Sequence, residues 1–248
     1  KNGFTFYYPK NSRSDAGYLI LSAANSKSNG FPLVELWDLN AQKKIHTYDF
    51  NYKEIFKKYN IDKKKFRLIH PLILNDGSLI VNTLTGIKNT VFKFDKCGKL
   101  IKSIDKFRTH HSLEIDEDGN IYSPTYLKRK DINKNAILHP VNFLHDGFII
   151  FDKNLKVKES FSLLDIYEAN NLYSDIYGNQ RLINDPFHLN DVQPLKSSKG
   201  KKYVLLSLKG HSRLMLIRLE DLKVIWLIDR ATLLQHDVDI IGFKEDFI

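Results

Sequence analysis

Cysteine and long apolar stretches are the scarcest features of this 248-residue chain. Cys97 is its only cysteine, so the sequence excludes an internal disulfide and a zinc site held by several cysteines. No apolar run approaches the ~20 residues that a membrane-spanning helix needs, so we expect no membrane span. The sequence starts at Lys1 with neither an initiator methionine nor a signal peptide, and we therefore allow for a targeting segment upstream of it.

Two kinds of catalytic motif are also missing. The chain has no G-x-S-x-G elbow, which argues against a serine hydrolase. It has no H-E-x-x-H or other pair of histidines at helical spacing, which argues against a metal site built on a helix. We accordingly expect neither a bound metal nor a cofactor.

Basic residues outnumber acidic ones, 38 to 29, which gives a formal net charge of +9 and a pI near 9.3. Much of the positive charge is clustered at 63–65, 128–130 and 196–202, in segments typical of loops. No nucleic-acid-binding motif accompanies these clusters, so we interpret them as solvated loop residues and expect no nucleic-acid partner. The excess charge still suits the attraction of anionic small molecules.

Short runs of alternating apolar and polar residues fill the chain. They lie between Asp, Asn and Gly turns, a pattern typical of many short antiparallel strands. The runs are at 17–21, 33–38, 44–46, 75–81, 90–95, 98–101, 116–122, 147–152, 155–157, 202–207, 214–220 and 223–226. Two further segments, at 52–59 and 161–171, have apolar residues at helical spacing and predict short surface helices.

An aromatic residue followed by aspartate recurs at a fixed interval. The pairs stand 57 positions apart, at Trp37-Asp38, Phe94-Asp95 and Phe151-Asp152, with Leu219-Glu220 as a looser fourth copy. A constant period indicates repeated units, each interpreted as an inner strand, a middle strand ending at the acidic residue, and an outer strand. A β-sandwich or a split barrel is the alternative, because strand patterns alone do not choose among these architectures.

The constant period favours an all-β fold, namely a β-propeller with four-stranded antiparallel blades. We expect residues 1–248 to form a single domain of about four blades. The sequence ends inside what is expected to be the next inner strand, so an incomplete ring, truncated at one or both ends, is predicted.

Three histidine-bearing segments, 110–112, 185–191 and 235–237, border predicted strands. In a propeller, the entries to the innermost strands of different blades face one another at a mouth of the central channel. His188 and His236 are therefore predicted to converge there. Strand alternation places the imidazoles of His110 and His111 on opposite faces, so at most one of them joins the cluster.

The remaining histidines are assigned to structural positions, on the surface or hydrogen-bonded in turns. They are His46, His70, His139, His145 and His211. A zinc or manganese shell, formed by the clustered imidazoles with Asp185, Asp237 or Asp239, is the rival chemistry for the site.

Four motifs occur in a fixed order: HHS at 110–112 with the turn DEDGN at 116–120, DPFHLNDVQP at 185–194, SLK at 207–209, and QHDVDI at 235–240. Together they resemble the bacterial arylsulfotransferase family, propeller enzymes that move a sulfuryl group between phenols without a nucleotide sulfate donor. The resemblance covers about 110–241, and the long motif at 185–194 is its most specific part. It implies a periplasmic or secreted enzyme whose partners are a small-molecule aryl sulfate and a phenol.

The resemblance also implies roles for individual residues. His236 matches the histidine that becomes transiently sulfated, and His188 and the His110-His111 pair match supporting histidines. Lys209 stands where the family pattern has arginine, which keeps the positive charge but loses the planar fork that grips two oxygens.

The residues themselves suit this chemistry. A neutral imidazole attacks a sulfate monoester when nearby cations stabilise its oxygens, and Lys209 supplies one such cation. A protonated histidine helps the phenolate to leave, and an acceptor phenol reverses the steps, which predicts ping-pong kinetics. The alternative is a propeller that has lost the chemistry and serves as a binding or scaffold module, which the Lys209 departure would explain.

Overall fold

The computed structural model describes residues 17–24, 31–61, 66–84, 89–128, 144–177, 185–197, 199–230 and 232–240. Within these ranges the protein is built from four antiparallel sheets and a few short helices. The predicted all-β class is confirmed. In the described part of the chain, no helix is long and apolar enough to cross a membrane.

Each sheet joins strands that are consecutive in the chain. The first contains β1 (Tyr18–Ala24), β2 (Pro32–Asp38) and β3 (Lys43–Tyr48), and the second β4 (Arg67–Ile73), β5 (Leu79–Leu84), β6 (Val91–Phe94) and β7 (Leu100–Ile104). In the third, the short strands β8 (Arg108–Thr109) and β9 (Glu114–Ile115) both pair with β10 (Ile121–Leu127), followed by β11 (His145–Phe151) and β12 (Val157–Ser162). The fourth contains β13 (Leu189–Lys196), β14 (Lys202–Leu208), β15 (Arg213–Arg218) and β16 (Val224–Asp229).

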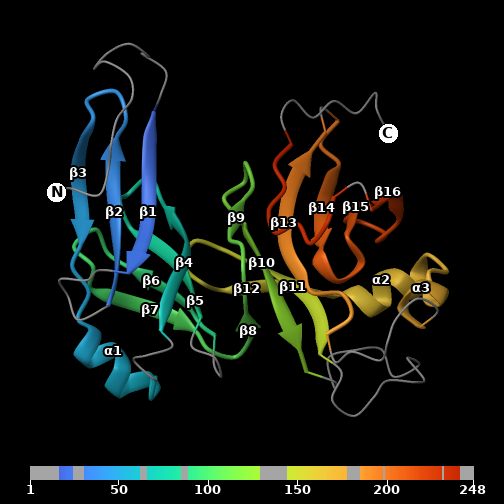
Figure 1. Ribbon diagram of the computed structural model, residues 1–248, viewed down its shortest axis with the longest axis horizontal. Helices are drawn as coiled ribbons and strands as arrows, with labels where there is room; N and C mark the ends of the chain where they lie inside the picture. The colour runs from blue at the N-terminus through green and yellow to red at the C-terminus, as the bar shows by residue number, and fades with distance from the viewer. Residues whose placement is uncertain are drawn as a thin grey trace.

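The four sheets follow one another in chain order across the molecule (Figure 1). Every sheet is an antiparallel meander, the strand order that a propeller blade requires. The described strands do not define a closed ring, so the propeller itself stays a prediction.

The repeated aromatic–aspartate pair marks the same place in successive sheets. Phe94 ends β6 and Phe151 ends β11, each the third strand of its sheet. The following aspartate closes the turn to the fourth strand: Asp152 Oδ1 accepts the backbone N–H groups of Asn154 at 2.8 Å and Lys156 at 2.9 Å. The acidic turn was expected after the middle strand of three. In the first sheet Asp38 does end β2, the middle strand, whereas in the second and third sheets the turn follows a third strand and leads to a fourth.

The looser fourth copy differs in detail. In the turn after β15 the accepting residue is Asp221, one position beyond Glu220. The Oδ1 atom of Asp221 accepts the backbone N–H of Lys223 at 3.3 Å. Polar side chains that satisfy backbone N–H groups in this way are typical of turns. These aspartates therefore explain the 57-residue period as a requirement of the fold.

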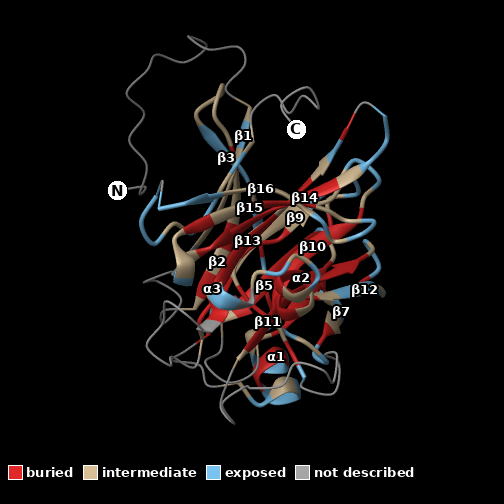
Figure 2. Cartoon of the chain, turned by 90° about the vertical axis from the view of Figure 1, so that its right-hand side faces the viewer, coloured by how far each residue is buried: buried red, intermediate tan, exposed pale blue. Residues whose placement is uncertain are grey.

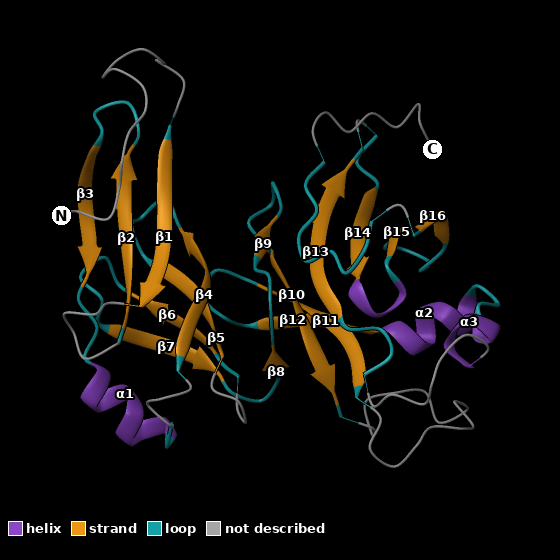
Figure 3. Cartoon of the chain, in the orientation of Figure 1, coloured by secondary structure: helices purple, strands orange, loops and turns teal. Residues whose placement is uncertain are grey.

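Both predicted helices are confirmed. Helix α1 (Tyr52–Tyr59) is capped by Asn51, whose side chain accepts the Glu54 N–H, and buries Ile55 and Phe56 against the first two sheets. Helix α2 (Leu163–Ala169) is capped by Ser162 and packs beside the third and fourth sheets, with α3 (Tyr173–Tyr177) next to it (Figure 3).

Burial is greatest in the middle strands of the sheets and low in their last strands. Strands β10, β11 and β13 are buried along most of their length, whereas β3, β7 and β12 are largely exposed (Figure 2). One apolar cluster joins the third and fourth sheets through Phe148, Phe187, Val192 and Leu206. This packing fixes β13 against β10 and so fixes the two segments that carry the histidine motifs.

The lysine clusters are only partly described. Lys196 and Lys202 flank the β13–β14 hairpin and both reach Asp118 of the neighbouring sheet, at 3.1 and 3.0 Å. They are surface residues, as expected, although they pair with a carboxylate. The cluster at 63–65 and residues 129–130 lie outside the described residues.

Candidate active site

Three histidines stand at matching places on the first strands of successive sheets. His70 lies within β4, His111 between β8 and β9, and His188 directly before β13. All three have left-handed backbone, with φ of 47°, 54° and 48°. Non-glycine residues rarely adopt this conformation, and here the strand pairing shifts register beside His70 and His188. A bulge of this kind turns a side chain away from the direction that regular strand alternation would give it.

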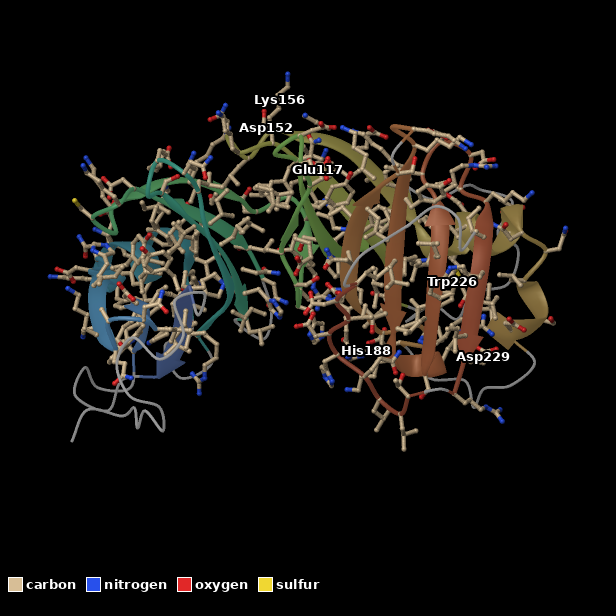
Figure 4. All side chains as sticks on the ribbon, turned by 90° about the horizontal axis from the view of Figure 1, so that it is seen from above. Glu117, Asp152, Lys156, His188, Trp226 and Asp229 are labelled. Atoms are coloured by element: carbon tan, nitrogen blue, oxygen red, sulfur yellow. The ribbon has the colours of Figure 1, made fainter. Side chains whose placement is uncertain are left out.

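The structure brings three of the predicted imidazoles together. The ring of His111 lies 5.5 Å from that of His188 and 5.9 Å from that of His236, centroid to centroid. His188 is half-buried between the third and fourth sheets, on the far side of the view from Asp152 and Lys156 (Figure 4). Burial and the nearby charges of His188 and His236 lower the pKa of His111 to about 4. His111 is therefore neutral at neutral pH.

His110 takes the other direction, as alternation predicted. Its ring is 3 % exposed, packs 4.3 Å from the Tyr126 ring, and stands perpendicular to His111. Burial and the charge of His111 lower the pKa of His110 to about 3. His110 is therefore neutral and lies behind the cluster, with its Nε2 3.3 Å from Oδ1 of the buried Asp146.

His188 is oriented by a carboxylate. Its Nδ1 lies 2.7 Å from Asp185 Oδ2, so Nδ1–H donates to Asp185 and Nε2 faces away from it. Tyr126 also donates to Asp185 Oδ2, at 3.2 Å. Burial alone would raise the pKa of Asp185, but hydrogen bonds from His188 and Asp146 lower it. The buried Asp146 has a raised pKa, because it is desolvated and next to Asp185. The surroundings therefore favour the protonated form of Asp146 and the charged form of Asp185.

Lys209 begins a short 3₁₀ helix, Lys209–His211, directly after β14. Its backbone N–H donates to the His188 carbonyl at 3.1 Å, which ties the two motif segments together. Its positive charge also contributes to lowering the pKa of His111, although burial and the neighbouring histidines have larger effects. The predicted cation therefore lies within electrostatic reach of the imidazoles.

His236 lies in the segment 232–240, which was expected to be a strand from Asp237 onward. That expectation is wrong for the described residues, because the segment has no ladder hydrogen bonds. It is held by individual contacts instead: Asn190 Nδ2 donates to Gln235 O at 2.9 Å, and Val238 N–H donates to Asp191 Oδ2 at 3.3 Å. His236 is exposed, and its Nδ1 lies 3.1 Å from Leu234 O. Because a carbonyl oxygen only accepts, Nδ1–H donates to it and the lone pair of a neutral His236 lies on Nε2.

A family profile described as Arylsulfotransferase (ASST) matches residues 70–247 of this chain. The chain belongs to the arylsulfotransferase family. The suspected resemblance is therefore confirmed, and the match contains every predicted site residue and His70. No curated protein matches the sequence.

Several solved structures resemble this arylsulfotransferase-family chain at low identity. The Kuenenia stuttgartiensis hydrazine synthase is 14% identical, with a TM-score of 0.46 over 76% of this chain and 46% of that one. A Bacteroides caccae protein of unknown function is 11% identical, with a TM-score of 0.38 over 87% of this chain and 62% of that one. Dihydro-heme d1 dehydrogenase NirN is 9% identical, with a TM-score of 0.44 over 87% and 36%. The chain spans less than two thirds of the length of each.

The candidate active site contains residues that sequence analysis missed. His70 was assigned a structural position, but its charge acts on His111 and it lies near Asp237. Its place in the first strand, equivalent to those of His111 and His188, was the signal that could have found it. His46 and His211 stay outside the cluster: His46 contacts Lys96 O, and His211 contacts the Tyr167 hydroxyl. His139 lies outside the described residues.

Carboxylates form a second group beside the imidazoles. Glu114 of β9, Asp191 of β13 and Asp237 place oxygens within 4.8 Å of one another. Burial and the charges of Asp191 and Asp237 raise the pKa of Glu114 to about 8, and burial raises that of Asp191 to about 6. Two of the aspartates that the sequence suggested as metal ligands are thus separated. Asp185 is hydrogen-bonded to His188, and Asp237 lies in the carboxylate group with Glu114 and Asp191.

A cavity of about 540 Å³ lies farther along the fourth sheet. It is lined by Asp175, His211, Arg213, Asp229 and Arg230, and Arg213 is already paired with both aspartates. None of the imidazoles of His111, His188 and His236 lines it. We therefore place the candidate active site at the imidazole cluster.

Proposed function

We propose that this protein transfers a sulfuryl group from an aryl sulfate to a phenol through a sulfated His236, without a nucleotide donor. The observation that carries the proposal is that three imidazoles from distant segments of the chain lie together. The ring of His111 is 5.5 Å from that of His188 and 5.9 Å from that of His236. Family membership supports the same reaction class. The substrate-facing mouth of a β-propeller, of which residues 1–248 form part, is the architecture that suits this convergence.

In the first half of the proposed reaction, Nε2 of His236 attacks the sulfur in line with the bond to the aryl oxygen. The S–N bond forms, the S–O bond breaks, and the leaving phenolate takes a proton from Nε2–H of a protonated His188. Asp185 suits His188 to this role, because its carboxylate compensates the charge of the imidazolium. Lys209 stabilises the sulfuryl oxygens.

In the second half, an acceptor phenol gives its proton to Nε2 of His188 and attacks the sulfur. The S–N bond breaks, a new aryl sulfate leaves, and both histidines return to their starting states. Neutral His111 lines the same space without adding a charge that would repel the two cationic groups. A periplasmic or secreted setting, as the family resemblance implies, is part of this proposal.

The second candidate is a binding module for anionic aromatic molecules that has lost the transfer step. Lys209 is the specific observation in its favour, since an ammonium is a point charge where a guanidinium would grip two oxygens.

The test uses the full chain with a chromogenic aryl sulfate and a phenol acceptor. We expect turnover with ping-pong kinetics, and with donor alone a mass increase of one sulfuryl group on the peptide that contains His236. His236→Ala should lower kcat by more than about 10³-fold. His46→Ala is the matched control, because His46 lies in the first sheet, where it contacts Lys96 O and the Tyr48 ring.

An inactive wild-type protein that still binds the aryl sulfate in calorimetry would favour the binding module. Activity that survives His236→Ala would overturn the sulfohistidine mechanism.

A further inference from the structure

The carboxylates of Glu114, Asp191 and Asp237 come from three separate segments. Glu114 lies in β9, Asp191 in β13, and Asp237 in the C-terminal segment that runs between these two strands (Figure 1). Each offers an oxygen within 4.8 Å of the other two. Oxygens bound to one calcium ion at about 2.4 Å are at most about 4.8 Å apart, and the separations of these three stay within that limit.

The negative charge of this group is not balanced by protein cations. Among the described residues, none of the three carboxylates forms an ion pair with lysine or arginine. The charges that act on Glu114 are those of Asp191, Asp237 and Asp239, all of the same sign. Gathering like charges around a buried residue is unfavourable unless a positive charge joins them. The protein is basic overall, which makes an unpaired acidic group more notable.

A buried hydroxyl supplies the second observation. Ser112 is 0 % exposed, and its Oγ has no hydrogen-bond partner among the described residues. The same hydroxyl lies beside the Asp191 carboxylate, where it contributes to lowering the pKa of that group against the larger effect of burial. A fully buried hydroxyl without a partner costs free energy, so its position beside the carboxylates indicates that it completes an oxygen-lined site.

We propose that Glu114, Asp191 and Asp237, with the Ser112 hydroxyl beside them, bind one calcium ion. Calcium takes six to eight oxygen ligands in flexible geometry, and these groups offer only oxygens. Zinc prefers nitrogen and sulfur ligands, and magnesium requires shorter and more regular octahedral distances. This differs from the zinc or manganese shell considered from the sequence, which used imidazoles and Asp185.

The ion would act on the segment that carries His236. Residues 232–240 lack ladder hydrogen bonds, and Asp237 is directly adjacent to His236. An ion shared by Glu114, Asp191 and Asp237 joins this segment to the third and fourth sheets. Calcium thereby positions His236 against His111 and adds positive charge near an anionic substrate. Calcium binding does not depend on the sulfuryl transfer proposed above.

The experiment uses thermal unfolding of the full chain after removal of metals with a chelator. Calcium at about 100 times its dissociation constant should raise the melting temperature by roughly 5–10 °C. Potassium at equal ionic strength should not, and magnesium and zinc should act more weakly. Calorimetry should give one calcium per chain.

Two variants assign the site. Asp237→Asn, at an exposed position, and Glu114→Gln should each weaken calcium binding by at least about 10-fold. Glu117→Gln is the matched control, an exposed glutamate three positions along the same segment, and should bind calcium as the wild type does.

The proposal is overturned if calcium gives no more stabilisation than potassium, or if it binds equally well to the wild type, Asp237→Asn and Glu114→Gln. A preference for zinc or magnesium would overturn the calcium assignment. None of these readouts uses sulfuryl transfer, so an inactive protein that binds calcium, and an active one that does not, are both recognisable.

Discussion

The turns after the third strands and the first strands of the same sheets differ sharply in regularity. Turns such as that at Asp152 repeat at a fixed interval, and one carboxylate satisfies two backbone N–H groups. The first strands are interrupted: β8 and β9 are two short pieces, and the pairing of β4 and β13 shifts register. The regular turns therefore carry the fold, and the chemistry-bearing side chains gather where regularity is lost.

The irregularity has an energetic cost. Left-handed backbone at a non-glycine residue costs about 1–3 kcal/mol, and His70, His111 and His188 all adopt it. Such strain persists when packing on both sides determines the conformation, as the buried contact of β10 with β13 does here. Strain at three equivalent histidines, next to unpaired carboxylates, is the pattern of a functional site. If this comparison is right, changes on the site side should affect activity, and changes at the turns only stability.

Among the changes that leave His236 in place, the largest effect is expected at Lys209. Lys209→Ala removes the cation that faces the sulfuryl oxygens, and kcat/KM should fall by about 10²–10³-fold, with little change in melting temperature. Lys209→Arg restores the planar fork and should be at least as active as the wild type. Steady-state kinetics with the chromogenic donor measure both. Equal activity of the wild type and Lys209→Ala would show that the sulfate is bound elsewhere.

A smaller effect is expected at Asp185. Its carboxylate accepts Nδ1–H of His188, whereas the amide of Asp185→Asn can donate to Nδ1 and favour the opposite tautomer. In that tautomer the proton of neutral His188 is already on Nε2, and no carboxylate balances the charge of the protonated form. Proton transfer at Nε2 is therefore impaired, and kcat should fall by about 10–100-fold while KM changes less.

Tyr126→Phe is the control for Asp185, because it removes the other hydrogen bond to Oδ2 without changing the tautomer of His188. It should lower kcat by less than about 5-fold if tautomer control is what matters. A purely structural role for Asp185 would give similar losses for the two variants, together with similar falls in melting temperature.

The same contrast explains how far the sequence could be interpreted. The period of the aromatic–aspartate pairs predicted the strand pattern, because a turn aspartate works through its own neighbouring backbone. His188, His236 and one member of the His110-His111 pair were predicted to meet from their motifs. His70 and Glu114 were missed, since each is a single polar residue in an ordinary strand pattern. Their roles depend on left-handed backbone at a bulge and on the packing of β9 against β13, which no local pattern encodes.

The smallest effect is expected at a third-strand turn, and it tests the comparison from the other side. Asp152→Ala removes the acceptor for the Asn154 and Lys156 N–H groups, which should lower the free energy of unfolding by about 1 kcal/mol and the melting temperature by about 2–4 °C. Because Figure 4 places Asp152 across the molecule from His188, kcat of the folded protein should be unchanged. Asp105→Ala, at an exposed position between β7 and β8, is the matched control and should alter neither quantity. A fall in kcat for Asp152→Ala beyond its loss of folded protein would mean that the regular turns and the irregular first strands are coupled, and that the division drawn here between fold and chemistry is wrong.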